Sequence, residues 1–218
     1  MKMKMKMKMK MCRLSALMFG VFPVNLVLSC LLLSAVASMP ALAAAFGSAS
    51  ALVRGEVVVE ALPAKGSARA VKAVGTVRAK PDSVWKALTD YPAFPEYMPN
   101  VVESKVQKQE GDNIWVASKF SVTIKNVNYV LKLTHEHQVK PWKITWTRVE
   151  GDLNAIDGHY IVQEVPEGTR IEYVSIIDSG SFVPGFIQEA LTKRSVPDLF
   201  KAVAERAVKI ESREIKVN

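Results

Sequence analysis

Apolar and polar residues alternate with a period of two over most of the chain beyond its N-terminal quarter. The stretch 71–79 is the first clear case, because Lys72 and Arg78 stand between its apolar positions. Residues two apart on a strand share one face, so this pattern predicts a strand with one apolar side. The preceding apolar run 56–59 and a turn at Pro63 complete a predicted β-hairpin.

Further strand-like runs follow, separated by short segments rich in Gly, Pro, Asp, Asn and Glu. Such residues form turns, and connections this short suit antiparallel neighbours, because parallel strands need crossovers of a dozen residues or more. The sequence therefore predicts an antiparallel meander with strands at 101–109, 114–124, 127–139, 144–149, 159–165 and 170–178.

Three segments carry a helical pattern instead. Pro81 suits a first helical turn and predicts a short helix, and a second short turn is expected at 94–98. Apolar residues recur at spacings of three and four over 184–210, which predicts a long amphipathic helix. Because Pro197 lies inside this pattern, a break or kink is expected near Ser195. The helix needs a partner surface, which the concave face of the sheet can supply.

The N-terminal region has the pattern of a secretory signal peptide. Basic residues at the start are followed by an uncharged stretch, 14–53, with an apolar run at 26–36 and small residues at 41–43. This order predicts cleavage near residue 43 and export to the periplasm or the extracellular space. An uncleaved membrane anchor and a lipoprotein processed at Cys30 are the alternatives.

The length and hydrophobic content suit one domain with appendages. A chain of 218 residues that is 49% hydrophobic can bury one sizeable core. The predicted organisation is a signal peptide at 1–43, a linker and the first hairpin strand at 44–66, one folded domain at 67–212 and a tail at 213–218.

The formal net charge of +8 does not indicate a nucleic-acid-binding protein. Six basic residues lie within the first thirteen, and without them 23 basic residues face 21 acidic ones. A nearly neutral domain lacks the electrostatic footprint of such a protein. Both cysteines, Cys12 and Cys30, precede the domain, which therefore has no thiol for a disulfide, a nucleophile or a thiolate metal site.

Several short motifs resemble those of one superfamily. They are the segments 84–91 (VWKALTDY), 98–101 (MPNV), 158–160 (GHY), 168–173 (GTRIEY) and 183–185 (VPG). With them the sequence resembles the START-like helix-grip superfamily, which includes polyketide cyclases and ubiquinone-binding proteins, over about two thirds of the chain. The resemblance implies an α+β fold in which a curved antiparallel sheet wraps around a long C-terminal helix, with two short helices after the first strand. Members include carriers, sensors and enzymes, so the fold does not choose among them.

Alternation also predicts which side chains point inward. If the inner strand faces lie under the C-terminal helix, they enclose an apolar space with a few polar groups, as small-molecule pockets do. The alternative is that these side chains fill the interior at crystal-like density. The predicted ligand-binding residues are Trp85, Phe120, Tyr129, Leu131, Leu133, His135, Trp146, Tyr160, Phe186, Ile187 and Leu191.

No metal, cofactor or catalytic residue is predicted. His135 and His137 share a strand face and could present two imidazoles to one ion, but only His159 or a carboxylate such as Asp157 is available as a third ligand. The domain contains no nucleophile motif or glycine-rich phosphate loop. The pair Asp90-Tyr91 is interpreted as structural.

The function hypothesis is an exported carrier that binds a hydrophobic small molecule such as a lipid, a quinone or a polycyclic compound. One alternative is a cyclase or dehydratase in which Tyr129, His135 or Tyr160 supplies protons. Another is a ligand-free interaction module. Basic residues of the C-terminal helix, Arg206 among them, alternate with acidic ones, which predicts a solvated face. Transient membrane contact stays open, and no protein partner is identified.

Overall fold

Eight strands and a long C-terminal helix make up the part of the chain that the computed structural model describes, residues 53–122, 125–180 and 185–217. The N-terminal hairpin and the segment after it consist of β1 (Val53–Leu62), β2 (Arg69–Val77), α2 (Pro81–Thr89), the 3-10 turn η1 (Tyr91–Ala93) and α3 (Phe94–Tyr97). The remaining elements are β3 (Val101–Glu110), β4 (Asn113–Val122), β5 (Lys125–Glu136), β6 (Trp142–Gly151), β7 (Ala155–Val165), β8 (Gly168–Asp178) and α4 (Gly185–Val217).

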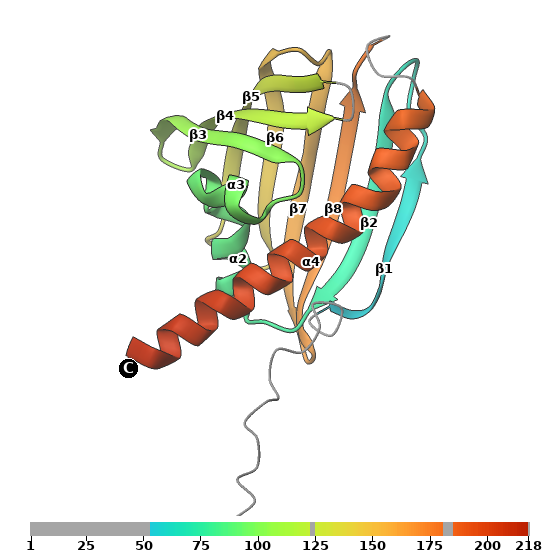
Figure 1. The fold of residues 1–218 in the computed structure, drawn as a ribbon. Coiled ribbons are helices and arrows are strands. Elements are labelled where there is room, and N and C mark those ends of the chain that lie inside the picture. Colours follow the sequence, from blue (N-terminus) through green and yellow to red (C-terminus); the bar gives the residue numbers. More distant parts are fainter. Residues whose placement is uncertain (1–52, 123–124, 181–184, 218) are drawn as a thin grey trace, which may run out of the picture. The chain divides into compact units, whose positions relative to one another are not determined.

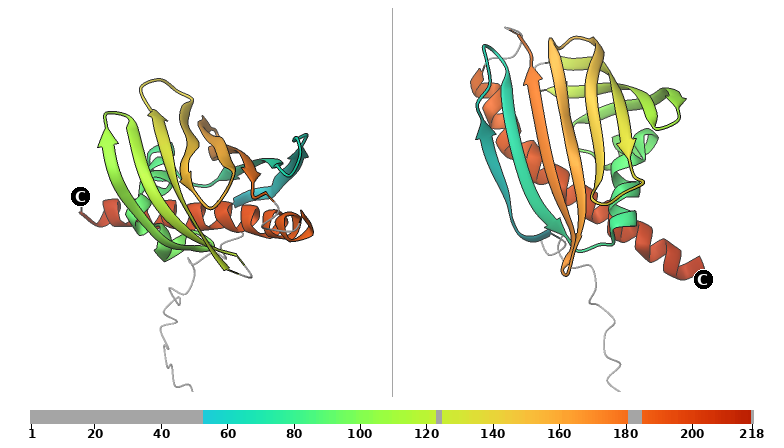
Figure 2. Two further views of the ribbon diagram at one scale, coloured as in Figure 1. Left: turned by 90° about the horizontal axis from the view of Figure 1, so that it is seen from above. Right: turned by 180° about the vertical axis from the view of Figure 1, so that it is seen from behind.

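All strands belong to one sheet with the order β1-β2-β8-β7-β6-β5-β4-β3, and every neighbouring pair is antiparallel. The predicted hairpin and meander are confirmed. The pairing of β2 with β8 brings together segments about a hundred residues apart, with Ala73 opposite Tyr173. The sheet curves strongly, and α4 crosses its concave side (Figures 1 and 2).

The short helices cover one end of the concave side. Pro81 occupies the first turn of α2, where its fixed φ fits and its missing N–H costs nothing. Val84, Trp85 and Leu88 of α2 are buried. The two short helices follow β2, which is the first strand of the domain predicted at 67–212.

Helix α4 runs without a break from Gly185 to Val217 and includes Pro197, so no break occurs near Ser195, while the alternative of a kink there stays a prediction. Proline removes one backbone hydrogen bond from a helix. The residues around it compensate, because Val196 and Phe200 are buried against the sheet side of the core. Packing of an amphipathic face commonly outweighs such local propensity.

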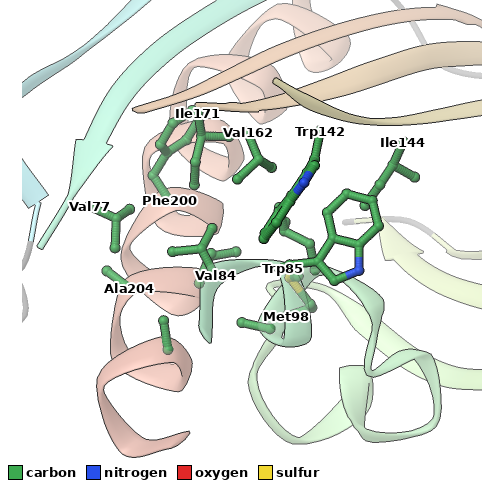
Figure 3. Packing of buried hydrophobic residues seen from close by; sticks show 14 of the residues in the cluster. Val77, Val84, Trp85, Met98, Trp142, Ile144, Val162, Ile171, Phe200 and Ala204 are labelled. Atoms are coloured by element: carbon green, nitrogen blue, oxygen red, sulfur yellow. The ribbon is translucent and has the colours of Figure 1, made fainter. Parts of the chain in front are cut away.

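The core lies where the second half of α4 and α2 meet the sheet. Phe200 of α4 is fully buried and belongs to the same cluster as Ile171 and Val162 of the sheet (Figure 3). Gly75 of β2 allows this approach, since a Cβ there would lie 2.8 Å from Cδ1 of Phe200. Trp85 and Trp142 close the cluster on the other side, with ring centroids 5.6 Å apart.

Arg206 fastens α4 to the short helices. Its Nη2 donates to Oδ2 of Asp90 at 2.6 Å, its Nη1 lies 3.4 Å from Oε2 of Glu96, and the guanidinium stands 4.9 Å from the ring centroid of Tyr97. The Arg206 side chain is only 13% exposed, so the predicted solvated position is wrong for this residue. A partly buried guanidinium with these partners holds the helix in place.

The N-terminal region lies outside the described residues. The signal peptide at 1–43, its two alternatives and export therefore stay predictions. Among the helices that the structure describes, none is both long enough and apolar enough to cross a bilayer.

Candidate ligand-binding face

The strand register maps the inner face of the sheet row by row. One row consists of Ser175, Gly158, Trp146, Leu133 and Ile114. The row nearer to α2 consists of Tyr173, Tyr160, Ile144 and His135. On the other side of the first row, Leu131 pairs with Arg148 and with Val116. These rows are the candidate functional site.

An aromatic cluster lies flat on the middle of this face. The ring of Trp146 stands 5.0 Å from that of Tyr160 and 5.9 Å from that of Tyr173, with an angle of 24° to the latter. Gly158 makes this possible, because a Cβ there would lie 2.4 Å from Cζ2 of Trp146. We call Trp146, Tyr160 and Tyr173 the aromatic floor.

Three tyrosines of the inner face are partly buried and partly accessible. Tyr129, Tyr160 and Tyr173 are only half-buried by exposed area, yet burial raises the pKa of all three phenols. A side chain on an outer surface would keep its hydration and its ordinary pKa. The strand register places all three rings on the inner face, so their accessible surface faces the concave side of the sheet, where a protonated phenol can donate a hydrogen bond.

A histidine pair lies beside this face, near α2. The Tyr91 hydroxyl and Nε2 of His135 are 2.5 Å apart. Burial raises the pKa of Tyr91 and lowers that of His135, so a protonated phenol and a neutral imidazole share this hydrogen bond. The His137 ring stacks on that of Trp85 with the ring centroids 4.6 Å apart, and its centroid lies 4.1 Å from that of Trp142. In the described part of the chain no three potential metal ligands come together.

The neutral state of His135 makes the stability of the fold depend on pH. Burial lowers the pKa of His135 from its ordinary value of 6.5, while the Asp112 charge raises it and His137 lowers it. The folded protein thus binds this proton more weakly than the unfolded chain does. We expect the free energy of unfolding to be highest above pH 6.5 and to fall as the pH drops below that value.

Urea unfolding at pH 5, 6, 7 and 8 checks this expectation. His135→Gln should reduce the loss of stability toward pH 5, because the titrating group is gone. His159→Gln is the matched control, since His159 lies on the outer face near Glu172, and it should retain the loss. An unchanged pH profile in His135→Gln would contradict the assignment.

The structure distributes the predicted site residues over two environments. Trp85, Leu133 and Trp146 are buried among other side chains, whereas five predicted residues keep accessible surface. These five are Phe120, Tyr129, Leu131, His135 and Tyr160. The side chains of Phe186, Ile187 and Leu191 lie outside the described residues. Ligand contact by any of the eleven stays a prediction.

Two inner-face residues were missed by the sequence analysis. Tyr173 alternates with Ile171 and Ser175 on β8, a signal that was present but was assigned only to a family motif. Arg148 follows Trp146 at the correct spacing of two, but a charged residue is not expected on an apolar face.

Two grooves described by the structure lie away from the aromatic floor. One of about 470 Å³ lies between α2 and α4 and is lined mainly by charged residues such as Lys86, Asp90 and Arg213. The other, of about 480 Å³, runs across β3 to β6 and is lined largely by polar residues such as Glu103, Lys119 and Asn128. Neither groove is lined by a residue of the aromatic floor, although apolar atoms make up most of the lining of the second, to which Tyr129 and Val130 contribute.

The architecture and the position of this face define a class of protein. A curved antiparallel sheet held around a long C-terminal helix, with two short helices after the first strand of the domain, is the helix-grip fold of START-like proteins. A family model described as "Polyketide cyclase / dehydrase and lipid transport" matches residues 68–210, and the chain belongs to this family.

Solved structures share the fold at low sequence identity. The Zhui aromatase/cyclase from a Streptomyces species is 16% identical, with a TM-score of 0.57 over 65% of this chain and 94% of its own. A STAR-related lipid transfer protein from Xanthomonas axonopodis is 15% identical, with a TM-score of 0.55 over 68% and 98%. A Thermus thermophilus protein is 20% identical, with a TM-score of 0.57 over 65% and 98%. A search of curated proteins finds no match.

Proposed function

We propose that the protein binds and carries a hydrophobic small molecule on the inner face of the sheet, beneath α4. The family includes lipid transport in its description, and one of the similar structures is a STAR-related lipid transfer protein. The observation that carries the proposal is the set of rings Tyr129, Tyr160 and Tyr173, which the strand register places on the inner face and which keep accessible surface there.

The surroundings of these rings favour an apolar guest. Leu131 and Ile156 lie on the same face and are half-buried, and the aromatic floor offers flat apolar surface. Burial of apolar area contributes about 25 cal/mol per Å², so a modest contact area gives useful affinity without a charged contact. The phenols add a few directional donors.

The chemistry of the face favours carriage over catalysis. A general acid or base works best with a pKa near the working pH, and burial raises the pKa of the three phenols away from it. Burial lowers the pKa of His135 below its ordinary value, and its Nε2 already shares a hydrogen bond with Tyr91. The cyclase alternative, supported by the Zhui aromatase/cyclase among the similar structures, predicts that Tyr129→Phe or Tyr160→Phe abolishes turnover, whereas a carrier keeps its guest.

Native mass spectrometry of the protein, purified gently from the cells that express it, tests carriage. We expect a co-purifying lipid, quinone or polycyclic compound that dissociates in the gas phase. Leu131→Trp adds bulk to the inner face and should remove this adduct. Lys132→Trp is the matched control, because Lys132 follows Leu131 in β5 and lies on the outer face. This variant should retain the adduct.

A guest-free mass in the unaltered protein, with no binding from a total lipid extract, would contradict the proposal. If the folded Leu131→Trp variant still carries the adduct, the guest binds somewhere other than on this face. Overpacking costs about 1–3 kcal/mol, so circular dichroism must show that the variant folds.

We also propose that the carrier acts outside the cytoplasm, because the N-terminal region has the order of a signal peptide. Fractionation of expressing cells, with N-terminal sequencing of the mature chain, should place the protein in the envelope and its new N-terminus near residue 43. A cytoplasmic, unprocessed chain would contradict this part.

A further inference from the structure

One end of the inner face is polar. Arg148 of β6 lies opposite Leu131, on the face that also bears Trp146. Two residues before Leu131, Tyr129 lies opposite Ser118 of β4, which in turn lies opposite Ser104 of β3. The register thus places a phenol and two hydroxyls in one row across β5, β4 and β3, and a guanidinium in the adjacent row beside Leu131. We call Arg148, Tyr129, Ser118 and Ser104 the polar end.

Strand alternation directs the arginine to this face, and a β-bulge directly follows it. The register of β5 and β6 shifts between Val130 and Leu131, so that Val149 is the extra residue. On the near side of the bulge, Thr147 bonds to Asp157 on the outer face, and its neighbour Arg148 therefore points inward.

Two buried atoms of the polar end have no hydrogen-bond partner. Nε of Arg148 and Oγ of Ser104 are buried, and neither has a hydrogen-bond partner. The one hydrogen bond given for the guanidinium is from Nη2 to the Gly151 carbonyl, at 2.8 Å. Among the described residues no carboxylate lies within ion-pair distance of Arg148.

Such groups are uncommon inside folded proteins. Buried polar atoms are nearly always hydrogen-bonded, and buried charges are nearly always paired, because an unpaired one loses its hydration without compensation. Among the described residues three such atoms occur, and two of them belong to inner-face residues of one end of the sheet, while the third is Nε of Arg206 on α4. A ligand that supplies acceptor oxygens and a negative charge would pair with the guanidinium of Arg148.

We propose that the polar end binds the carboxylate of an amphipathic acid whose apolar body lies along Leu131 and the aromatic floor. A planar guanidinium matches a carboxylate with two parallel N–H···O bonds, and one guanidinium balances one negative charge. The phenol of Tyr129 and the serine hydroxyls are further donors. The inference rests on the proposed carrier function and names the class of guest, a long-chain carboxylic acid.

Equilibrium dialysis with two probes of equal chain length, palmitate and hexadecanol, tests this assignment at pH 8, where the acid is ionised. The protein is purified from the expressing cells and delipidated first. A charge-assisted bond in a partly buried site predicts that palmitate binds about 10- to 100-fold more tightly than hexadecanol. Arg148→Gln should remove this preference, because it weakens the binding of palmitate more than that of hexadecanol.

Arg170→Gln is the matched control. Arg170 is exposed on β8 and lies opposite Gln163, so the change removes the same charge from the protein without touching the polar end. It should leave the preference for palmitate intact. Arg148→Lys keeps the charge but loses the planar fork, and should lower the preference severalfold without abolishing it.

The outcomes separate the two proposals. Equal affinities of the unaltered protein for both probes, or a full preference retained in Arg148→Gln or Arg148→Lys, would overturn the carboxylate site and leave carriage standing. Failure of both probes to bind, together with a guest-free native mass, would remove the carrier function itself. If Arg148→Gln does not fold, the affinities of the unaltered protein and of Arg148→Lys for palmitate and hexadecanol still test the carboxylate site.

Discussion

Replacing Phe200 by alanine should lower the free energy of unfolding by about 3–5 kcal/mol, the usual cost of removing a buried phenylalanine. The Phe200 side chain is fully buried and meets the sheet where Gly75 leaves room for its ring. Few atoms near it can collapse into the space, because Ile171 and Val162 are held in the sheet ladder. The loss should therefore lie at the upper end of the range.

Urea unfolding followed by circular dichroism measures the effect. Lys201→Ala is the matched control, because Lys201 is the next residue of α4 and is exposed, and its cost should stay within about 0.5 kcal/mol. A loss of less than about 1.5 kcal/mol in Phe200→Ala would mean that α4 does not depend on this contact. Since α4 covers the inner face, we also expect the variant to retain its guest poorly.

Gly158→Ala should have the second largest effect, a loss of about 1–3 kcal/mol from overpacking. The added methyl would lie 2.4 Å from Cζ2 of Trp146 and 2.2 Å from the Val174 carbonyl oxygen. The indole must shift, and with it the aromatic floor. Binding of the guest should weaken together with stability.

A double-mutant cycle with Trp146→Leu identifies the cause. If the methyl collides with the indole, Gly158→Ala should cost less in the Trp146→Leu protein than in the unaltered one, by more than the roughly 0.5 kcal/mol expected of independent sites. Additive losses would instead assign the cost to the contact with the Val174 carbonyl. Urea unfolding of the four proteins provides the measurement.

Much of the fold follows from local patterns. The alternation over 71–79 predicts β2, the turn residues around Glu110–Asn113 and Pro166–Gly168 predict tight connections, and Pro81 predicts the start of α2. Each of these signals involves neighbours in the chain, whose preferences depend little on the rest of the molecule.

The candidate site was predicted only in part, because local patterns give the face of a residue but not its exposure. Alternation correctly places Tyr129, Leu131 and Tyr160 on the inner face. It cannot tell that Trp85 is enclosed by Trp142 and two histidines while Tyr160 keeps accessible surface. That difference depends on where α2 and α4 lie on the sheet, which no single strand encodes.

By itself the sequence determined which residues form strands, which side of each strand is apolar and that one amphipathic helix ends the domain. Tertiary structure alone decided that β2 pairs with β8, that α4 continues through Pro197, that Tyr91 bonds to His135 and that Nε of Arg148 is buried without a hydrogen-bond partner. The first set rests on the fixed periodicity of the backbone, which acts over a few residues. The second set depends on contacts between segments far apart in the chain, and these exist only after the sheet has curved and the helix has packed against it.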